Sequence, residues 1–130
     1  MIIKTENLMK LFRTEDIETT ALDEVDLSIA EGEFTSIMGP SGCGKSTLLH
    51  ILGLIDNPDG GKYWFLDEEV SSYSERQRAN LRKENIGFVF QSFNLIDELT
   101  VYENVELPLI YTKTPSNERN AKVEQVLEKM

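Results

Sequence analysis

The pattern of apolar and polar positions predicts a sheet near the N-terminus of the chain. Apolar residues alternate with polar ones at Val25, Leu27 and Ile29, which is the pattern of a half-exposed strand. Residues 1–8 have strand character and are suited to pair with it. Residues 34–38 form a short, mostly apolar run of the kind that a buried strand shows. We therefore expect an antiparallel sheet followed by a buried strand.

A helix with one apolar face is predicted shortly after this run. Beyond about Lys45, apolar residues recur at three- and four-residue spacing, at Leu48, Leu49, Leu52 and Ile55. Residues 56–61 combine a proline with two glycines, so we expect the helix to end there. Residues 63–66 should then return as an antiparallel strand.

The second half of the chain predicts three helices and one strand. Residues 74–77 and 100–103 have the capping-box pattern that opens a helix, and the second of these helices should end at Pro108. Residues 86–90 are rich in strand formers and predict a strand between the two helices. After residue 115 the apolar residues fall on one helical stripe, at Val123, Val126, Leu127 and Met130.

Composition and charge narrow the class of protein. The chain has 130 residues, of which 40% are hydrophobic and 28% charged, as in an ordinary globular domain. Its net charge is −10, with acidic residues spread along the chain, which argues against a nucleic-acid partner. The longest apolar stretch, residues 48–55, is far shorter than the roughly 20 residues of a membrane-spanning helix. No export signal opens the sequence, so we expect a cytoplasmic location.

The strongest chemical signal is the segment Gly-Pro-Ser-Gly-Cys-Gly-Lys-Ser-Thr at residues 39–47. It satisfies the phosphate-loop pattern G-x-x-x-x-G-K-[ST] and stands between the predicted strand and the predicted helix. Glycines permit left-handed backbone and a close approach to an anion, and the helix adds its unpaired amides and positive dipole end. We expect a nucleotide to be bound by all nine residues: Gly39, Pro40, Ser41, Gly42, Cys43, Gly44, Lys45, Ser46 and Thr47.

The polar side chains of this phosphate loop have distinct expected roles. Lys45 would reach the β- and γ-phosphates as a point charge, and Thr47 would contact the α-phosphate. The Ser46 hydroxyl would ligate Mg²⁺, which proteins usually bind through substrate phosphates. The sequence therefore predicts a site for a nucleoside di- or triphosphate with magnesium.

Over its whole length the chain resembles the ATP-binding subunits of ABC transporters. Phe12 lies 27 residues before Gly39, where this family places an aromatic residue that stacks on adenine. Residues 21–33 resemble the family's entry into its phosphate-loop strand, and residues 86–91, Ile-Gly-Phe-Val-Phe-Gln, match its Q-loop. By this resemblance Gln91 would touch Mg²⁺ and the attacking water, and would act with Lys45 in catalysis. The loop after Gln91 would sense the membrane partner.

Two further segments indicate a subgroup of this family. Residues 92–96 and 99–109 are close to the branch that serves macrolide export and lipoprotein release. Taken alone, Phe12 is equally compatible with a plain core role and Gln91 with a polar position at a strand end. Their spacing relative to the phosphate loop favours the nucleotide roles.

The resemblance implies an α/β fold, with a P-loop NTPase core, an N-terminal antiparallel β subdomain and the start of a helical subdomain, truncated before the Walker B motif. Residues 1–130 would be the N-terminal part of an ABC ATP-binding domain. The expected parts are the antiparallel β subdomain at 1–33 and 60–73, the phosphate-loop strand and helix at 34–59, the Q-loop strand at 86–91 and the start of the helical subdomain at 92–130.

The resemblance also implies partners. In this family two copies close head to tail over two nucleotides, and each works with a transmembrane permease at the inner face of the cell membrane. The family's LSGGQ signature, Walker B carboxylates and switch histidine come later than the Q-loop, and these 130 residues contain none of them. We therefore expect this chain, taken as it stands, to bind ATP weakly or to need its remainder, and to have negligible turnover.

Residues 63–68, Tyr-Trp-Phe-Leu-Asp-Glu, imitate the Walker B form of an apolar strand that ends in acidic residues. They follow the loop helix directly through a Pro-Gly turn and match a hairpin of the family's antiparallel subdomain. We interpret them as that hairpin rather than as magnesium ligands.

Two other functions remain as alternatives. Guanylate kinases carry a similar G-P-S-G-x-G-K-S-T loop, which would make the chain a nucleoside monophosphate kinase. In those enzymes the loop usually lies near the N-terminus, whereas 38 residues precede it here, and Arg119 is the only arginine after Arg82. The other alternative is a non-catalytic nucleotide-binding remnant.

Overall fold

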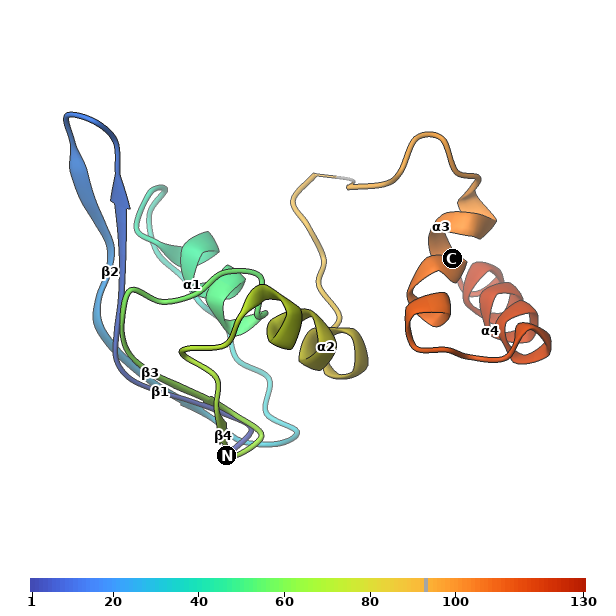
Figure 1. Ribbon diagram of the computed structural model, residues 1–130, viewed down its shortest axis with the longest axis horizontal. Coiled ribbons are helices and arrows are strands. Elements are labelled where there is room, and N and C mark those ends of the chain that lie inside the picture. The colour runs from blue at the N-terminus through green and yellow to red at the C-terminus, as the bar shows by residue number, and fades with distance from the viewer. Residues whose placement is uncertain (93) are drawn as a thin grey trace. The chain divides into compact units, whose positions relative to one another are not determined.

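A four-stranded antiparallel sheet with the strand order β2–β1–β3–β4 forms the base of the N-terminal unit (Figure 1). The computed structural model describes residues 1–92 and 94–130, which divide into two units, residues 1–82 and 83–130. The strands of the sheet are β1 (Ile3–Arg13), β2 (Glu18–Ile29), β3 (Gly60–Phe65) and β4 (Glu68–Glu69). The predicted pairing of the first two strands is confirmed, since Ile3 lies opposite Ile29 and Leu8 opposite Val25.

A β-bulge interrupts β1 at Asn7. Between Thr5 and Leu8 this strand advances three residues while β2 advances two, and the register against β3 shifts over the same stretch. The Asn7 backbone has a φ of 49°, and its N–H donates to the Asp26 carboxylate at 2.7 Å. Gly61 packs against the bulge so closely that a Cβ there would lie 2.2 Å from the Asn7 carbonyl oxygen. The bulge therefore requires a glycine on the neighbouring strand.

Helix α1 (Lys45–Leu52) confirms the helix predicted after the phosphate loop. Its buried face consists of Leu48, Ile51 and Leu52, whereas Leu49 is exposed. The predicted face was therefore wrong at Leu49, which lies about 100° around the helix from Leu48 and so falls outside the stripe. The helix also ends earlier than predicted, at Gly53, whose N–H donates to the Leu49 carbonyl.

The far end of α1 is attached to β3 through Tyr63. This residue is fully buried, and its phenol O–H donates to the Leu52 carbonyl at 2.7 Å. Burial raises the pKa of the Tyr63 phenol far above its ordinary value near 10. The bond satisfies one of the carbonyls that have no partner within a helix.

Residues 63–68 form the predicted hairpin between β3 and β4. Leu66 and Asp67 make its turn, with left-handed φ values of 51° and 65°. Trp64 lies opposite Glu69, and Phe65 opposite Glu68. The interpretation of this segment as part of the antiparallel sheet is confirmed.

Helix α2 (Glu75–Asn85) begins with the predicted capping box. The Ser74 N–H donates to the Gln77 side-chain oxygen at 2.9 Å, and the Gln77 N–H donates back to the Ser74 hydroxyl at 3.3 Å. Arg82 donates from the same helix to the carbonyl of Leu54, just beyond α1. Arg82 and Arg78 both bond to Glu75, and these bonds lower the pKa of its carboxyl.

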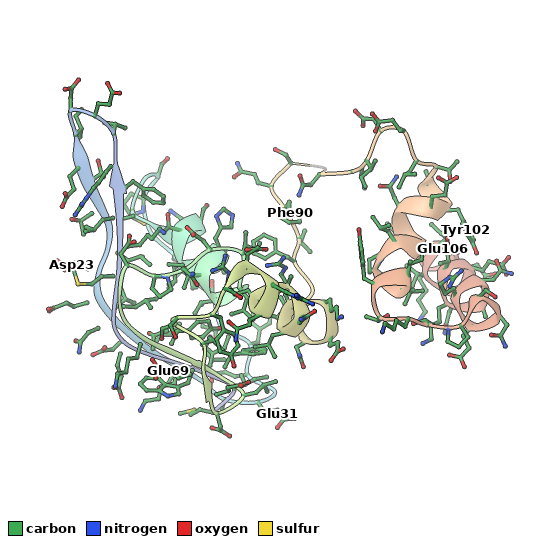
Figure 2. All side chains as sticks on the ribbon, in the orientation of Figure 1. Asp23, Glu31, Glu69, Phe90, Tyr102 and Glu106 are labelled. Carbon is green, nitrogen blue, oxygen red and sulfur yellow. The ribbon has the colours of Figure 1, made fainter. Side chains whose placement is uncertain are left out.

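The strands predicted at residues 34–38 and 86–90 are not present. A strand in a sheet is defined by its ladder of hydrogen bonds to a neighbour, and neither segment has such a neighbour among β1–β4. Phe34 and Val89 are 97% and 96% exposed. Phe88 and Phe90 contact each other, with ring centroids 4.7 Å apart. Phe90 lies on the connection that follows α2 (Figure 2).

In the described part of the second unit, the end of α2 is followed by the helices α3 (Val101–Tyr111) and α4 (Ser116–Glu128). Tyr102 and Glu106, one turn apart on α3, both contact α4 (Figure 2): the Tyr102 hydroxyl donates to the Asn120 side-chain oxygen at 2.8 Å, and Glu106 pairs with Arg119 at 3.5 Å. Val123 is the buried residue of the predicted α4 stripe, whereas Val126 and Met130 are exposed. The predicted helix is confirmed, and only part of its apolar stripe is buried.

The start of α3 follows its sequence pattern, but its end does not. The Thr100 hydroxyl accepts the Glu103 N–H at 3.1 Å, as the capping pattern predicted. Asn104 closes the preceding loop, because its amide group donates to the Ile96 carbonyl and accepts the Ile96 N–H. The predicted end at Pro108 was wrong, since α3 continues to Tyr111. Proline lacks an N–H and so removes one helical hydrogen bond, but the residues after it still form the last turn.

Phe93, within the segment 92–96 that indicated the subgroup, lies outside the described residues. Among the residues that are described, no helix is both long enough and apolar enough to span a membrane.

We predict that Tyr63→Phe lowers the free energy of unfolding of the full-length protein by about 1 to 3 kcal/mol, because the buried Leu52 carbonyl loses its donor. Urea denaturation measures this loss. Tyr111→Phe, at an exposed position, is the control and should cost less than about 0.5 kcal/mol.

The difference between wild type and Tyr63→Phe should also shrink as the pH rises above about 10. Unfolded Tyr63 loses its proton there while the buried phenol keeps it, so the unfolded wild-type chain gains stability. A difference that stays constant up to pH 11 would contradict the role of the buried phenol.

Candidate functional site

The phosphate loop leads directly into α1. Its glycines either adopt a left-handed backbone or leave room for a neighbouring side chain. Gly42 and Gly44 have left-handed φ values of 79° and 93°, which confirms the expectation at these two positions. Gly39 does not share this conformation, so the prediction was wrong there. A Cβ on Gly39 would instead lie 2.7 Å from the Cys43 sulfur. Gly39 therefore leaves room for the neighbouring side chain of the loop.

Gly44 also fixes the start of α1 against β2. The register changes between Lys10 and Leu11, where β1 advances one residue and β2 two, so Ala21 is the extra residue of a β-bulge. A Cβ on Gly44 would lie 2.4 Å from the Ala21 carbonyl oxygen and 3.3 Å from the Leu22 side chain. Nothing in the sequence pattern predicts this contact of Ala21.

The Lys45 ammonium group lies over the loop from which it extends. Its Nζ donates to the carbonyl oxygens of Gly39 and Pro40, both at 2.7 Å, and lies 3.5 Å from the Cys43 sulfur. An ammonium group carries three donors and no acceptor, and the sulfur is only a weak acceptor. The group therefore keeps capacity for a strong acceptor such as a phosphate oxygen.

Backbone amides at the N-terminus of α1 add to this positive end. The first helical hydrogen bond runs from the Leu48 N–H to the Gly44 carbonyl at 2.9 Å. The N–H groups of residues 45–47 precede this bond and have no partner within the helix. Ser46 is exposed at this end, and Thr47 is half-buried beside it. These residues fit the phosphates of a nucleotide and a magnesium ion held through them.

The sheet places Phe12 near the same loop. Phe12 lies opposite Thr19 on β2, two residues from Ala21, which contacts Gly44. With about 3.3 Å per residue along a strand and about 4.8 Å between strands, the Cα atoms of Phe12 and Ala21 are roughly 8 Å apart. The Phe12 side chain is 48% exposed. The first unit therefore brings together the predicted aromatic residue and the phosphate loop.

Sequence reasoning missed Lys10, which lies two residues before Phe12 on the same strand face. Its Nζ is 5.6 Å from the centroid of the Phe12 ring and donates to the Asn57 carbonyl at 2.9 Å. The two-residue spacing could have indicated this contact, because residues two apart on a strand lie on the same face.

Gln91 belongs to the second unit and is exposed, whereas the phosphate loop belongs to the first. Its contact with Mg²⁺ and with the attacking water stays a prediction.

Comparison with known families identifies the chain. A family model described as "ABC transporter" matches residues 22–130. The chain belongs to the ABC transporter family. The resemblance inferred from its motifs is confirmed, and so is the expected fold class, since the chain matches ABC ATPase cassettes with an N-terminal antiparallel sheet and helices.

Several relatives are similar to this ABC transporter chain over almost all of its residues. The macrolide export ATP-binding/permease protein MacB of Azoarcus sp. (strain BH72) is 45% identical over 97% of this chain and 19% of its own length. An uncharacterized ABC transporter ATP-binding protein of Thermotoga maritima is 45% identical over 98% of this chain and 54% of its own length. The chain thus spans about half the length of the second relative and about a fifth of the first.

A solved structure also matches almost all residues of this chain. The ATP-binding cassette MJ0796, in a dimeric post-hydrolysis state bound to ADP and Pi, matches with a TM-score of 0.91 and 41% identity. The match covers 97% of this chain and 56% of that one.

We predict that Gly44→Ala lowers the free energy of unfolding by at least about 2 kcal/mol more than Gly42→Ala. Both substitutions place a side chain at a left-handed φ, which costs about 1 to 2 kcal/mol, but only the first meets the Ala21 carbonyl. Gly42 has nothing within 4 Å of an added Cβ, which makes it a matched control. Equal losses in urea denaturation would contradict the proposed packing of Gly44.

Proposed function

We propose that the chain binds ATP and Mg²⁺ as part of an ABC transporter ATPase that drives transport through a membrane permease. The observation that carries this proposal is the phosphate loop, in which Lys45 lies 2.7 Å from two loop carbonyls beside the amide-bearing end of α1. An ammonium group, free N–H groups and a helix dipole that meet at one point favour a polyanion.

Each residue of the site has a role in this proposal. Lys45 exchanges part of its bonding to the loop carbonyls for the β- and γ-phosphates, while the amides of residues 42–47 hold the phosphate chain. Ser46 holds the magnesium ion, and Thr47 contacts the α-phosphate. Phe12 stacks on the adenine. Bound magnesium neutralises phosphate charge and orients the transferring group.

Hydrolysis requires more than these residues. Lys45 and Gln91 are the positions to which we assign catalytic roles, Gln91 as a contact of magnesium and the attacking water. The signature, Walker B and switch motifs are not among the 130 residues. We therefore propose ATP binding by this chain, with hydrolysis in an assembly where those motifs are supplied.

The proposed partners are a second ATP-binding subunit and a permease at the inner face of the cell membrane. Dimeric forms of the MJ0796 cassette support the first, and the name of MacB, an ATP-binding/permease protein, supports the second. A peripheral, cytoplasmic location at the membrane follows from this assembly. No comparison favours the nucleoside monophosphate kinase alternative, since the family and the relatives described above are ABC transporters.

We predict that Lys45→Ala weakens ATP binding about ten- to a hundredfold, because it removes charged hydrogen bonds worth about 1.5 to 3 kcal/mol. Isothermal calorimetry of the full-length protein with Mg²⁺ and ATP measures this change. Lys122→Ala on the exposed side of α4 is the matched control and should leave the affinity unchanged. An affinity that is the same in Lys45→Ala and wild type would contradict the proposed site.

A further inference from the structure

Lys10 is held by the segment that follows the phosphate-loop helix. Its side chain is only 12% exposed, and its Nζ lies 2.9 Å from the Asn57 carbonyl, 3.1 Å from the Asp56 carboxylate and 3.9 Å from the Asp59 carboxylate. These three residues come directly after α1 and its turn. The ammonium group is therefore held by three oxygen atoms of one segment.

The same segment is bonded to the backbone of β1. The Asp59 carboxylate accepts the Leu11 N–H at 2.7 Å, and the Asp59 N–H donates to the Met9 carbonyl at 2.8 Å. Lys10 lies between these two residues on the strand. Residues 9–11 of β1 and residues 56–59 after α1 are thus joined by several hydrogen bonds, with Lys10 in the middle of the bonded stretch of β1.

Lys10 also lies against the ring of Phe12. Residues two apart on a strand share a face, and the Lys10 Nζ is 5.6 Å from the centroid of the Phe12 ring, within the range of a cation–π contact. The ring is nevertheless 48% exposed. One side of the ring is therefore restrained by a fixed cation, and a large part of its surface is available to a flat ligand.

We propose that Lys10 is a positioning residue for base recognition, which holds the Phe12 ring at a set place relative to the phosphate loop. This inference rests on the proposed function, in which Phe12 stacks on the adenine. If Lys10 were only a structural ion-pair partner of residues 56–59, its loss would act through α1. It would then weaken the binding of the phosphates and of the base alike. A positioning role affects only the part of the affinity that depends on the base.

Binding of two ligands to the full-length protein with Mg²⁺ distinguishes the positioning role of Lys10 from a purely structural one. The first is AMP-PNP, a slowly hydrolysed ATP analogue that carries a base, and the second is inorganic tripolyphosphate, which carries none. The variants are Lys10→Met, which keeps an unbranched apolar stem without the charge, Phe12→Ala, and the double variant. Lys10→Gln, which retains a donor for the Asn57 carbonyl, replaces Lys10→Met if circular dichroism shows that Lys10→Met does not fold.

Lys10→Met should weaken AMP-PNP binding about three- to fivefold and leave tripolyphosphate binding unchanged. Phe12→Ala should weaken AMP-PNP binding at least about fivefold, because the stacking surface is lost. In the Phe12→Ala background the Lys10 substitution should have no further effect, since its action passes through the ring.

Three results would overturn the inference: equal losses for both ligands, no loss for AMP-PNP in Lys10→Met, or an undiminished Lys10 effect in the Phe12→Ala background. If Phe12→Ala itself binds AMP-PNP as tightly as wild type, the stacking role is wrong and the inference fails with it. Wild-type protein that binds neither ligand would contradict the proposed function as a whole.

Discussion

The absence of a Cβ at Gly44 is the constraint on which the site depends. The start of α1 can approach the bulged Ala21 of β2 only because Gly44 has no side chain, since a Cβ there would lie 2.4 Å from the Ala21 carbonyl oxygen. An isolated helix of eight residues is not stable in water, so α1 exists through its tertiary contacts. Gly44 fixes one end of it, and Tyr63 and Arg82 bond to carbonyls at or just beyond the other. The amides that face the proposed phosphates are therefore held in place by contacts of α1 with the rest of the first unit.

The phosphate loop is locally positive, although the chain as a whole is negatively charged. A net charge of −10 would repel a nucleotide at long range, but salt screens such charges beyond about 8 Å at physiological ionic strength. Within the loop the helix dipole, free amides and the Lys45 ammonium group act at contact distance. Because the loop carbonyls already hold Lys45, little side-chain freedom is lost when a phosphate binds. Local preorganisation thus makes an anion site possible on an acidic protein.

Local features were the ones that the sequence predicted well. The capping residues Ser74 and Thr100, the hairpin at residues 63–68 and the pairing of β1 with β2 depend on neighbours in sequence or on a simple alternation. The phosphate loop was recognised because its residue types and spacing are typical of one chemistry. Phe12 was predicted from the family resemblance, and its stacking on adenine stays a prediction. Residues 34–38 and 86–90 were predicted as strands from their apolar character, but a strand also needs a hydrogen-bonding partner, which periodicity cannot supply. The contacts of Lys10 with residues 56–59 and of Ala21 with Gly44 were missed for the same reason, since they join residues distant in sequence.

A crystal structure of the full-length protein with Mg²⁺ and AMP-PNP tests most directly whether residues 39–47 hold the phosphates. We predict phosphate oxygens within about 3.2 Å of the backbone nitrogens of residues 42–47, and the Lys45 Nζ bonded to the β- and γ-phosphates. Phosphates bound away from residues 39–47, or a Lys45 Nζ that contacts only the carbonyls of Gly39 and Pro40, would contradict it.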